Sequence, residues 1–194
     1  MPRRVIVTLL GPVRWAPPGI DPQMWRAALA EDVVDLLAML NEIDPAIAAT
    51  AADRALADAI AWPTMRVYDL TEPTANAAFE AATKDGYEQA AVIASDAPDV
   101  PGLVLGKLLR PLTTRPVAVA AAEPGLLGVA SRLPAPDWLP TLDLDAEPEI
   151  VRRAAPRPRD VAVAAAWRRL RGPADLATLD PAVEGWDATR ALLS

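Results

Sequence analysis

Residues 90–102 read A-A-V-I-A-S-D-A-P-D-V-P-G, an uncharged apolar run that ends abruptly in a turn. Apolar runs bounded by turn residues are typical of buried parallel strands. The carboxyl ends of such strands face the ligand crevice of an open α/β sheet. The turn therefore brings Ser95 and two carboxylates, Asp96 and Asp99, to a predicted crevice. Two carboxylates at such a place indicate a divalent metal and, with it, a phosphate ligand.

Apolar strands and helices alternate on both sides of this stretch. Strands are expected at residues 3–10, 46–50, 65–70, 90–94, 116–122, 126–131 and 138–144. Helices are expected at residues 22–40, 53–61, 72–85 and 102–109. Asp21 marks the start of the first helix, because aspartate is a favoured N-cap residue and Pro22 suits the first helical position. This alternation predicts an α/β fold with a mostly parallel sheet and right-handed crossovers.

The pattern changes after Asp145. Helices are expected at residues 147–154, 160–171 and 186–193. The chain is therefore divided into an α/β core, residues 1–145, and a helical C-terminal extension, residues 146–194, that packs on the core. A cluster of arginines is found at positions 152, 153, 157, 159, 168, 169 and 171. Such a cluster is typical of a solvated helical face, and attraction of a phosphorylated or acidic partner is the alternative.

The composition excludes several classes of site. The 194 residues suit one domain with a substantial core, and they include no cysteine and no histidine. Disulfides, thiolate zinc sites and Ser-His or Cys-His catalysis are therefore excluded. Any metal must be bound by oxygen, which favours Mg²⁺, Mn²⁺ or Ca²⁺.

The net charge and the hydropathy limit the kinds of partner that this protein can have. The formal net charge of −7 argues against a nucleic-acid surface. No apolar run reaches the roughly 18 residues of a membrane span. We expect a cytoplasmic protein without nucleic-acid or membrane partners, and the sequence is compatible with a homo-oligomer.

Asp96 is the better candidate for a metal ligand, because it lies at the predicted strand end. Mg²⁺ is usually held by one or two carboxylates together with substrate phosphates and waters. Asp99 is the second candidate, with the alternative that it caps the following helix. For both residues, an ordinary turn is the structural alternative.

The loop at residues 11–20 follows the first strand and opens onto the same crevice. Arg14 suits bidentate phosphate binding, and the next helix adds the partial positive charge of its N-terminus. Trp15 suits stacking on a base. The alternative is that both are ordinary surface-loop residues. The sequence contains neither G-x-G-x-x-G nor G-x-x-x-x-G-K-[ST], so standard dinucleotide and P-loop phosphate binding are not supported.

Two further acidic segments follow. Glu123 comes after the strand at residues 116–122, so it is expected to reach the same crevice and bind a ligand hydroxyl or the metal. Asp143 and Asp145 alternate on a predicted strand and share one face. We expect them to be solvated carboxylates at a strand end, with a metal ligand as the alternative.

Residues 68–102 resemble the central segment of a bacterial glycosyltransferase-A-like family. The family is known mainly as a domain of unknown function, and it is related to the nucleotidyltransferases that make molybdopterin guanine dinucleotide and phospholactyl-guanosine diphosphate. Its members show a helix, a Gly-aromatic turn, an apolar strand and S-D-x-P, and residues 95–98 read S-D-A-P. Residues 116–139 resemble the next strand and a Pro-rich turn, with E-P-G at 123–125 in place of D-G-G. The resemblance covers residues 3–145.

The resemblance implies a Rossmann-like, three-layer α/β/α fold of the nucleotide-diphospho-sugar transferase type. It implies a nucleotidyl or glycosyl transferase that binds a nucleotide or nucleotide sugar with Mg²⁺ or Mn²⁺, and it makes Asp96 the metal-binding aspartate. The residues expected to act are Asp96 and Arg14 in catalysis, Trp15, Ser95, Glu123 and Gly125 in substrate binding, and Asp96 and Asp99 in metal binding.

Two other functions stay open. Residues 17–24 read P-P-G-I-D-P-Q-M, without the basic residues that the family carries there. Their absence favours a catalytically diverged binding or assembly module on the same fold. A phosphatase-like hydrolase with Asp96 as nucleophile is the third reading, although the D-x-D-x-T/V pattern of such enzymes is missing.

Overall fold

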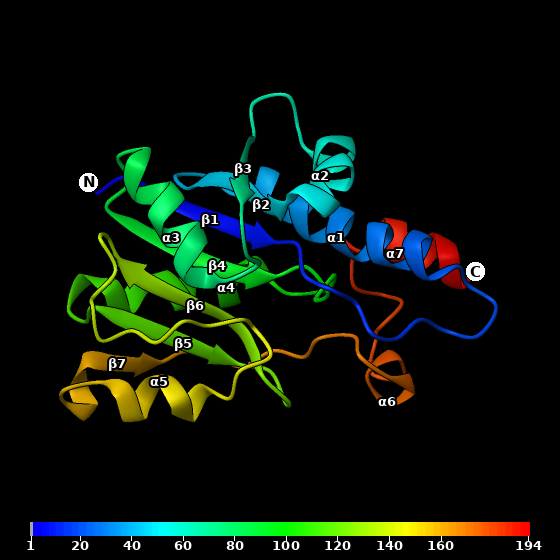
Figure 1. Ribbon diagram of the computed structural model, residues 1–194. Helices are drawn as coiled ribbons and strands as arrows, with labels where there is room; N and C mark the ends of the chain where they lie inside the picture. The colour runs from blue at the N-terminus through cyan, green and yellow to red at the C-terminus, as the bar shows by residue number, and fades with distance from the viewer. Residues whose placement is uncertain (1) are drawn as a thin grey trace.

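A seven-stranded sheet forms the centre of the protein in the computed structural model, which describes residues 2–194 (Figure 1). The strand order is β3-β2-β1-β4-β6-β5-β7. The strands are β1 (Arg4–Leu9), β2 (Asp44–Thr50), β3 (Arg66–Leu70), β4 (Gln89–Ala94), β5 (Val117–Ala121), β6 (Leu126–Arg132) and β7 (Val161–Val163). Only β6 runs antiparallel to its neighbours among these strands. The prediction of an α/β fold with a mostly parallel sheet is confirmed.

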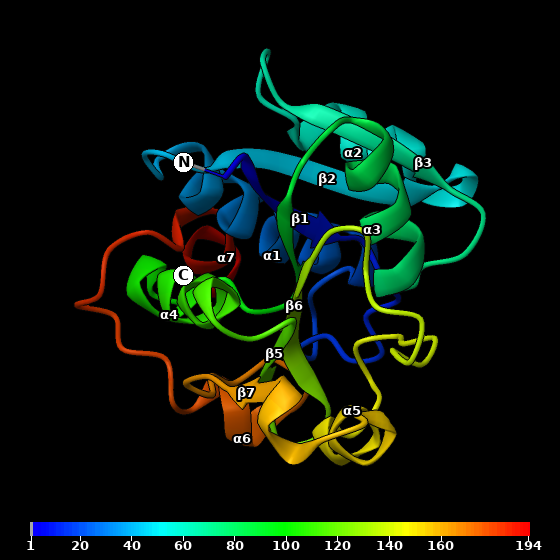
Figure 2. The same ribbon diagram turned by 90° about the vertical axis from the view of Figure 1, so that its left-hand side faces the viewer.

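Helices cover both faces of the sheet. They are α1 (Pro22–Ala38), α2 (Arg54–Ile60), α3 (Ala75–Lys84), α4 (Gly102–Leu109), α5 (Pro148–Ala154), α6 (Pro173–Leu176) and α7 (Asp187–Leu193), with 3₁₀ turns η1 (Ala51–Asp53), η2 (Arg110–Thr113) and η3 (Pro158–Asp160). Figure 2 shows α4 and α7 on one side of the sheet and α3 and α5 on the other. The result is a three-layer α/β/α arrangement with a helical C-terminal end.

Strand β4 shows why the apolar run at 90–94 is a central strand. Ala90, Val92 and Ala94 belong to the core under α3, whereas Ala91 and Ile93 belong to the core under α4. Successive side chains of a strand point to opposite faces, so a strand that is covered on both faces must be apolar throughout. All six residues of β4 are buried.

Helix α1 begins where the sequence predicts. The Asp21 carboxylate accepts hydrogen bonds of 2.9 Å from the backbone N–H groups of Gln23 and Met24. Pro22 occupies the first helical position, where a missing N–H costs nothing. This cap fixes the point at which the loop after β1 turns into the helix.

The predicted strand at residues 138–144 is wrong. The segment is irregular, and only Leu142 and Leu144 of its buried leucines keep the two-residue spacing of a strand, because Leu139 is out of phase with them. Pro140 interrupts it, and proline lacks the N–H that a sheet ladder needs. The backbone instead bonds to the start of α3, where the Ala75 N–H donates to the Leu142 carbonyl at 2.8 Å.

The predicted helix at residues 160–171 is also wrong. Its first residues form η3 and β7, and residues 164–171 then form neither helix nor strand. The Ala164 N–H donates to the Val119 carbonyl at 2.8 Å, and the Trp167 N–H donates to the Ala121 carbonyl at 3.1 Å. Backbone hydrogen bonds to the free edge of β5 therefore outweigh the helix propensity of this alanine-rich segment. β7 joins the same sheet as the strands of the α/β core.

The C-terminal helix α7 is held against α1 by a buried carboxylate. Asp32, on α1, accepts hydrogen bonds from the backbone N–H groups of Ala188 at 2.9 Å and Thr189 at 2.8 Å. Figure 1 shows the two helices side by side. Within residues 2–194, no helix is both long and apolar enough to cross a membrane.

Replacing Asp32 tests this attachment. Asp32→Ala leaves two backbone N–H groups without their acceptor, and we expect a loss of about 1–3 kcal/mol in the free energy of unfolding, measured with urea. The neighbouring Glu31 is exposed on the same helix. Glu31→Ala is therefore the control, with an expected change within about 0.5 kcal/mol. Equal effects of the two substitutions would contradict the attachment.

Candidate functional site

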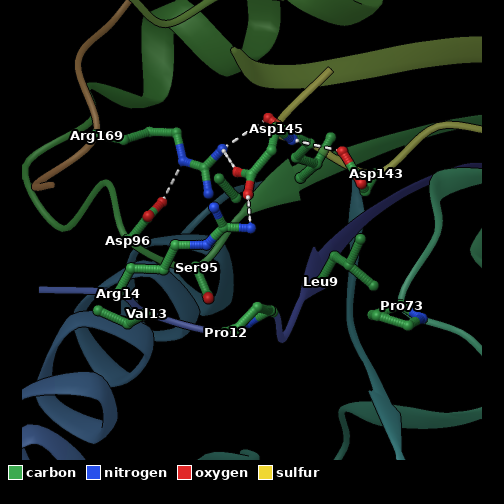
Figure 3. A pocket seen from close by; sticks show the side chains of 13 residues that line it. Leu9, Pro12, Val13, Arg14, Pro73, Ser95, Asp96, Asp143, Asp145 and Arg169 are labelled. Carbon is green, nitrogen blue, oxygen red and sulfur yellow. Dashed lines mark hydrogen bonds and ion pairs between the residues drawn. The ribbon is translucent and has the colours of Figure 1, made fainter. Parts of the chain in front are cut away.

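A crevice lies at the carboxyl ends of β1 and β4, which are paired so that Leu9 faces Ala94. The loop after β1 and the turn after β4 therefore start side by side. The hollow between them has a volume of about 130 Å³. Its lining comprises Leu9, Gly11, Pro12, Val13, Arg14, Pro73, Ala94, Ser95, Asp96, Asp143, Leu144, Asp145 and Arg169 (Figure 3). The position predicted for Ser95 and Asp96, at a crevice, is the one the structure shows.

A second hollow of about 300 Å³ adjoins the first. The two share Pro12, Val13, Arg14, Asp96 and Asp145, and the second also has Trp15, Pro124 and Arg171 in its lining. The shared residues form the partition between them. Arg14, Trp15, Ser95 and Asp96 are thus brought together from two loops that lie about eighty residues apart in the chain.

Two carboxylates and three arginines form the charged centre of this crevice. Arg169 Nε donates to Asp96 Oδ1 at 2.5 Å, and its Nη1 lies 3.3 Å from Asp145 Oδ1. Arg171 Nε lies 3.5 Å from Asp96 Oδ2, and Arg171 also donates to Asp145. Arg14 Nη2 lies 3.3 Å from Asp145 Oδ2. All four carboxylate oxygens therefore face a guanidinium group.

The three arginines differ in exposure. The side chain of Arg169 is 8% exposed, that of Arg171 is 25% exposed and that of Arg14 is 80% exposed. Arg169 Nη1 also donates to the backbone carbonyls of Leu144 at 2.7 Å and Leu126 at 3.2 Å. Arg169 is thus a fixed, buried cation, whereas Arg14 is held by one exposed ion pair.

The segment at residues 164–171 explains how the arginines reach the crevice. Arg169 and Arg171, two residues apart on this segment, both contact Asp96 and Asp145. Leu170 points the other way and is fully buried with Trp25 and Leu29 of α1. Its N–H donates to the Asp96 carbonyl at 2.7 Å, which ties the segment to the turn after β4.

Asp99 lies outside both hollows. Its Oδ1 accepts from Trp167 Nε1 at 3.2 Å, and its Oδ2 pairs with Arg168. The alternative that Asp99 caps α4 is wrong, because the N-cap residue of α4 is Pro101 and no side chain bonds there. Metal binding by Asp99 stays a prediction, and the structure does not place Asp99 in the crevice with Asp96.

Glu123 and Gly125 lie in the turn between β5 and β6. Glu123 is exposed and lines neither hollow. Gly125 has a φ of +87°, and a Cβ built there would lie 2.9 Å from the Leu144 carbonyl oxygen and 3.4 Å from Arg171 Nη1. The residue therefore supports the segment that carries Asp145, and it leaves no room for a side chain.

Arg169 and Arg171 are the site residues that sequence reasoning missed, because they were expected on a solvated helical face. Asp145 was expected as a solvated carboxylate, with a metal ligand as the alternative. The spacing R-L-R at residues 169–171, with an apolar residue between two charges, is the signal that could have identified a non-helical segment with a charged face.

Mg²⁺ and Mn²⁺ bind oxygen atoms, so the carboxylates of the crevice are their candidate ligands. Among residues 2–194, no three His, Cys, Asp or Glu side chains are grouped so that they could hold a metal ion. Asp96 and Asp145 do converge on one cationic centre, but that centre is the guanidinium of Arg169. Because the Arg169 guanidinium already lies between Asp96 and Asp145, the two carboxylates are not arranged to bind a divalent cation.

No family model and no curated protein sequence matches the chain. Solved structures match it over nearly its whole length. A protein from Desulfovibrio desulfuricans G20, assigned to the nucleotide-diphospho-sugar transferases, is 16% identical with a TM-score of 0.67, over 100% of this chain and 97% of that one. The 4-diphosphocytidyl-2C-methyl-D-erythritol synthase from Anaerococcus prevotii DSM 20548 is 11% identical with a TM-score of 0.60, over 98% of this chain and 96% of that one.

A third match is glucosyl-3-phosphoglycerate synthase from Mycobacterium tuberculosis in complex with Mg²⁺ and uridine diphosphate. It is 14% identical with a TM-score of 0.52, over 99% of this chain and 78% of that one. The chain therefore has the fold of the nucleotide-diphospho-sugar transferases. This confirms the resemblance at the level of the fold.

Gly125→Ala tests how closely the turn between β5 and β6 supports the crevice. We expect a loss of about 2–4 kcal/mol in the free energy of unfolding, because the left-handed backbone costs 1–2 kcal/mol and the new Cβ displaces Leu144. Gly185 also has a positive φ, of +97°, but nothing lies within 4 Å of a Cβ built there. Gly185→Ala should therefore show only the backbone cost, and losses of the same size at both positions would contradict the close support.

Proposed function

We propose that this protein is a transferase that binds a nucleotide or a nucleotide sugar in the crevice, with the phosphates at Arg14 and Arg171. The observation that carries the proposal is the convergence of three arginines at the carboxyl ends of β1 and β4. The fold supports it, because ligands of open α/β sheets bind at this edge.

Arg14 is the residue best placed to exchange a carboxylate for a phosphate. Its pair with Asp145 is exposed, and exposed ion pairs contribute only about 0–1 kcal/mol. A phosphate offers the guanidinium fork two strong acceptors, so the exchange is favourable. The proposal also places the base in the larger hollow, against the ring of Trp15, which lines it.

Nucleotidyl and glycosyl transfer both leave negative charge on a departing phosphate group. Fixed guanidinium groups stabilise such charge without rearranging during the reaction. Ser95 and Asp96 border the first hollow and would contact the transferred part of the substrate. Mg²⁺ or Mn²⁺ at Asp96 is also expected from the sequence, but the proposal rests on the arginines, because they already engage the carboxylate oxygens.

A catalytically diverged binding module is the second candidate. The observation that favours it is the small first hollow, about 130 Å³, which the Arg169 side chain borders. Ligand pockets commonly have about 300–1,000 Å³, so only the second hollow reaches that range. A binding module would bind nucleotides with the same arginine dependence and would transfer no group to any acceptor.

Calorimetric titration with UDP, GDP and CDP tests the proposal. We expect at least one to bind, and Arg14→Ala to weaken it about tenfold or more, because a charge-assisted hydrogen bond contributes about 1.5–3 kcal/mol. Arg153→Ala is the matched control, since Arg153 is also 80% exposed and carries one weak ion pair, 3.7 Å from Glu149. Failure of all three nucleotides to bind, or equal affinity in Arg14→Ala, would refute the proposal.

A further inference from the structure

We propose that the guanidinium of Arg169 is the resident cation of this crevice and that phosphate binding here requires no divalent metal. The inference rests on the proposed function, because it assigns how the same site binds a diphosphate. It follows from the position, the anchoring and the charge of Arg169.

The position of Arg169 is that of a bridging cation. Its Nε donates to Asp96 Oδ1 at 2.5 Å, and its Nη1 lies 3.3 Å from Asp145 Oδ1 (Figure 3). The two carboxylates come from different elements, the turn after β4 and the loop before α5, and they would repel each other without a cation between them. Arg169 meets this requirement with a guanidinium group, whose planar fork of donors matches the geometry of carboxylates.

The contacts that hold the Arg169 side chain in place make its replacement by a metal ion unfavourable. Besides the carboxylates, its guanidinium bonds the carbonyls of Leu126 and Leu144, and its side chain is 8% exposed. Withdrawal would leave both carbonyls and Asp96 without this partner, and it would pull on the buried Leu170. Buried polar groups that lose their partners are costly, so the arginine stays in place.

The charge of the cluster shows what Arg169 contributes. Arg14, Arg169 and Arg171 carry three positive charges, which balance the charges of the three carboxylates in the lining of the two hollows, Asp96, Asp143 and Asp145. Without Arg169 the remaining two arginines and three carboxylates sum to −1. Because a negative crevice would repel a diphosphate, binding depends on Arg169, while the more exposed Arg14 and Arg171 contact the ligand.

Titration of the full-length protein with inorganic pyrophosphate tests this inference, once in EDTA and once with Mn²⁺ in excess over pyrophosphate. We expect the wild type to bind pyrophosphate in EDTA, with no gain in affinity from Mn²⁺. Mn²⁺ alone, followed by its electron paramagnetic resonance signal, should not bind at the crevice. A requirement for Mn²⁺, or Mn²⁺ binding that Asp96→Asn abolishes, would overturn the inference.

Arg169→Met is the decisive variant. We expect it to bind pyrophosphate in EDTA about tenfold more weakly or worse, and added Mn²⁺ to restore part of the loss because Asp96 and Asp145 are then free. Arg168→Met is the matched control: it removes the neighbouring arginine, which pairs with Asp99 outside the crevice, and should leave pyrophosphate affinity unchanged. Wild-type affinity of Arg169→Met in EDTA would overturn the inference.

Two outcomes keep the inference distinct from the proposed function. If the wild type binds neither pyrophosphate nor any nucleotide, the proposed function fails, and the Mn²⁺ titration still decides whether Arg169 excludes a metal. If Arg169→Met does not give the cooperative thermal transition of a folded protein, the comparison of the wild type in EDTA and in Mn²⁺ decides the inference alone.

Discussion

The buried pair of Arg169 and Asp96 is the interaction on which the C-terminal part of this structure and its crevice both depend. It fastens the segment at residues 164–171 across the carboxyl edge of the sheet, and Asp145 and two backbone carbonyls bind the same guanidinium. Breaking a buried ion pair by removing one partner costs about 3–5 kcal/mol, a large share of the 5–15 kcal/mol that stabilises a typical domain. One contact therefore links the stability of the fold to the electrostatics of the site.

The strand and crevice at residues 90–102 could be predicted because local pattern and tertiary structure agree there. A strand with helices on both faces must be apolar, and the first polar residues after it must lie at the sheet edge. Helix α1 was predictable for a similar reason, since the Asp21 cap is a local interaction. Arg14, Trp15, Ser95 and Asp96 lie around the two adjoining hollows because both loops follow parallel strands, and their roles stay predictions.

The C-terminal segment could not be predicted because a distant partner determines its conformation. Residues 160–171 are rich in alanine and arginine and favour a helix locally, but the free edge of β5 binds their backbone instead. The roles of Arg169 and Arg171 were missed for that reason. Asp145 was expected in solvent, with a metal ligand as the alternative, and it lies at the crevice because the predicted strand, interrupted by Pro140, is a loop. Gly125 packs closely under that loop, and its expected part in substrate binding stays a prediction.

A double-mutant cycle of Asp96→Asn and Arg169→Met tests the central pair most directly, with the free energy of unfolding measured in urea. We expect each single substitution to cost about 3–5 kcal/mol and the double substitution to cost about 2–3 kcal/mol less than the sum of the two, which is the coupling energy of the pair. Additive effects, with a coupling energy within about 0.5 kcal/mol of zero, would contradict the account.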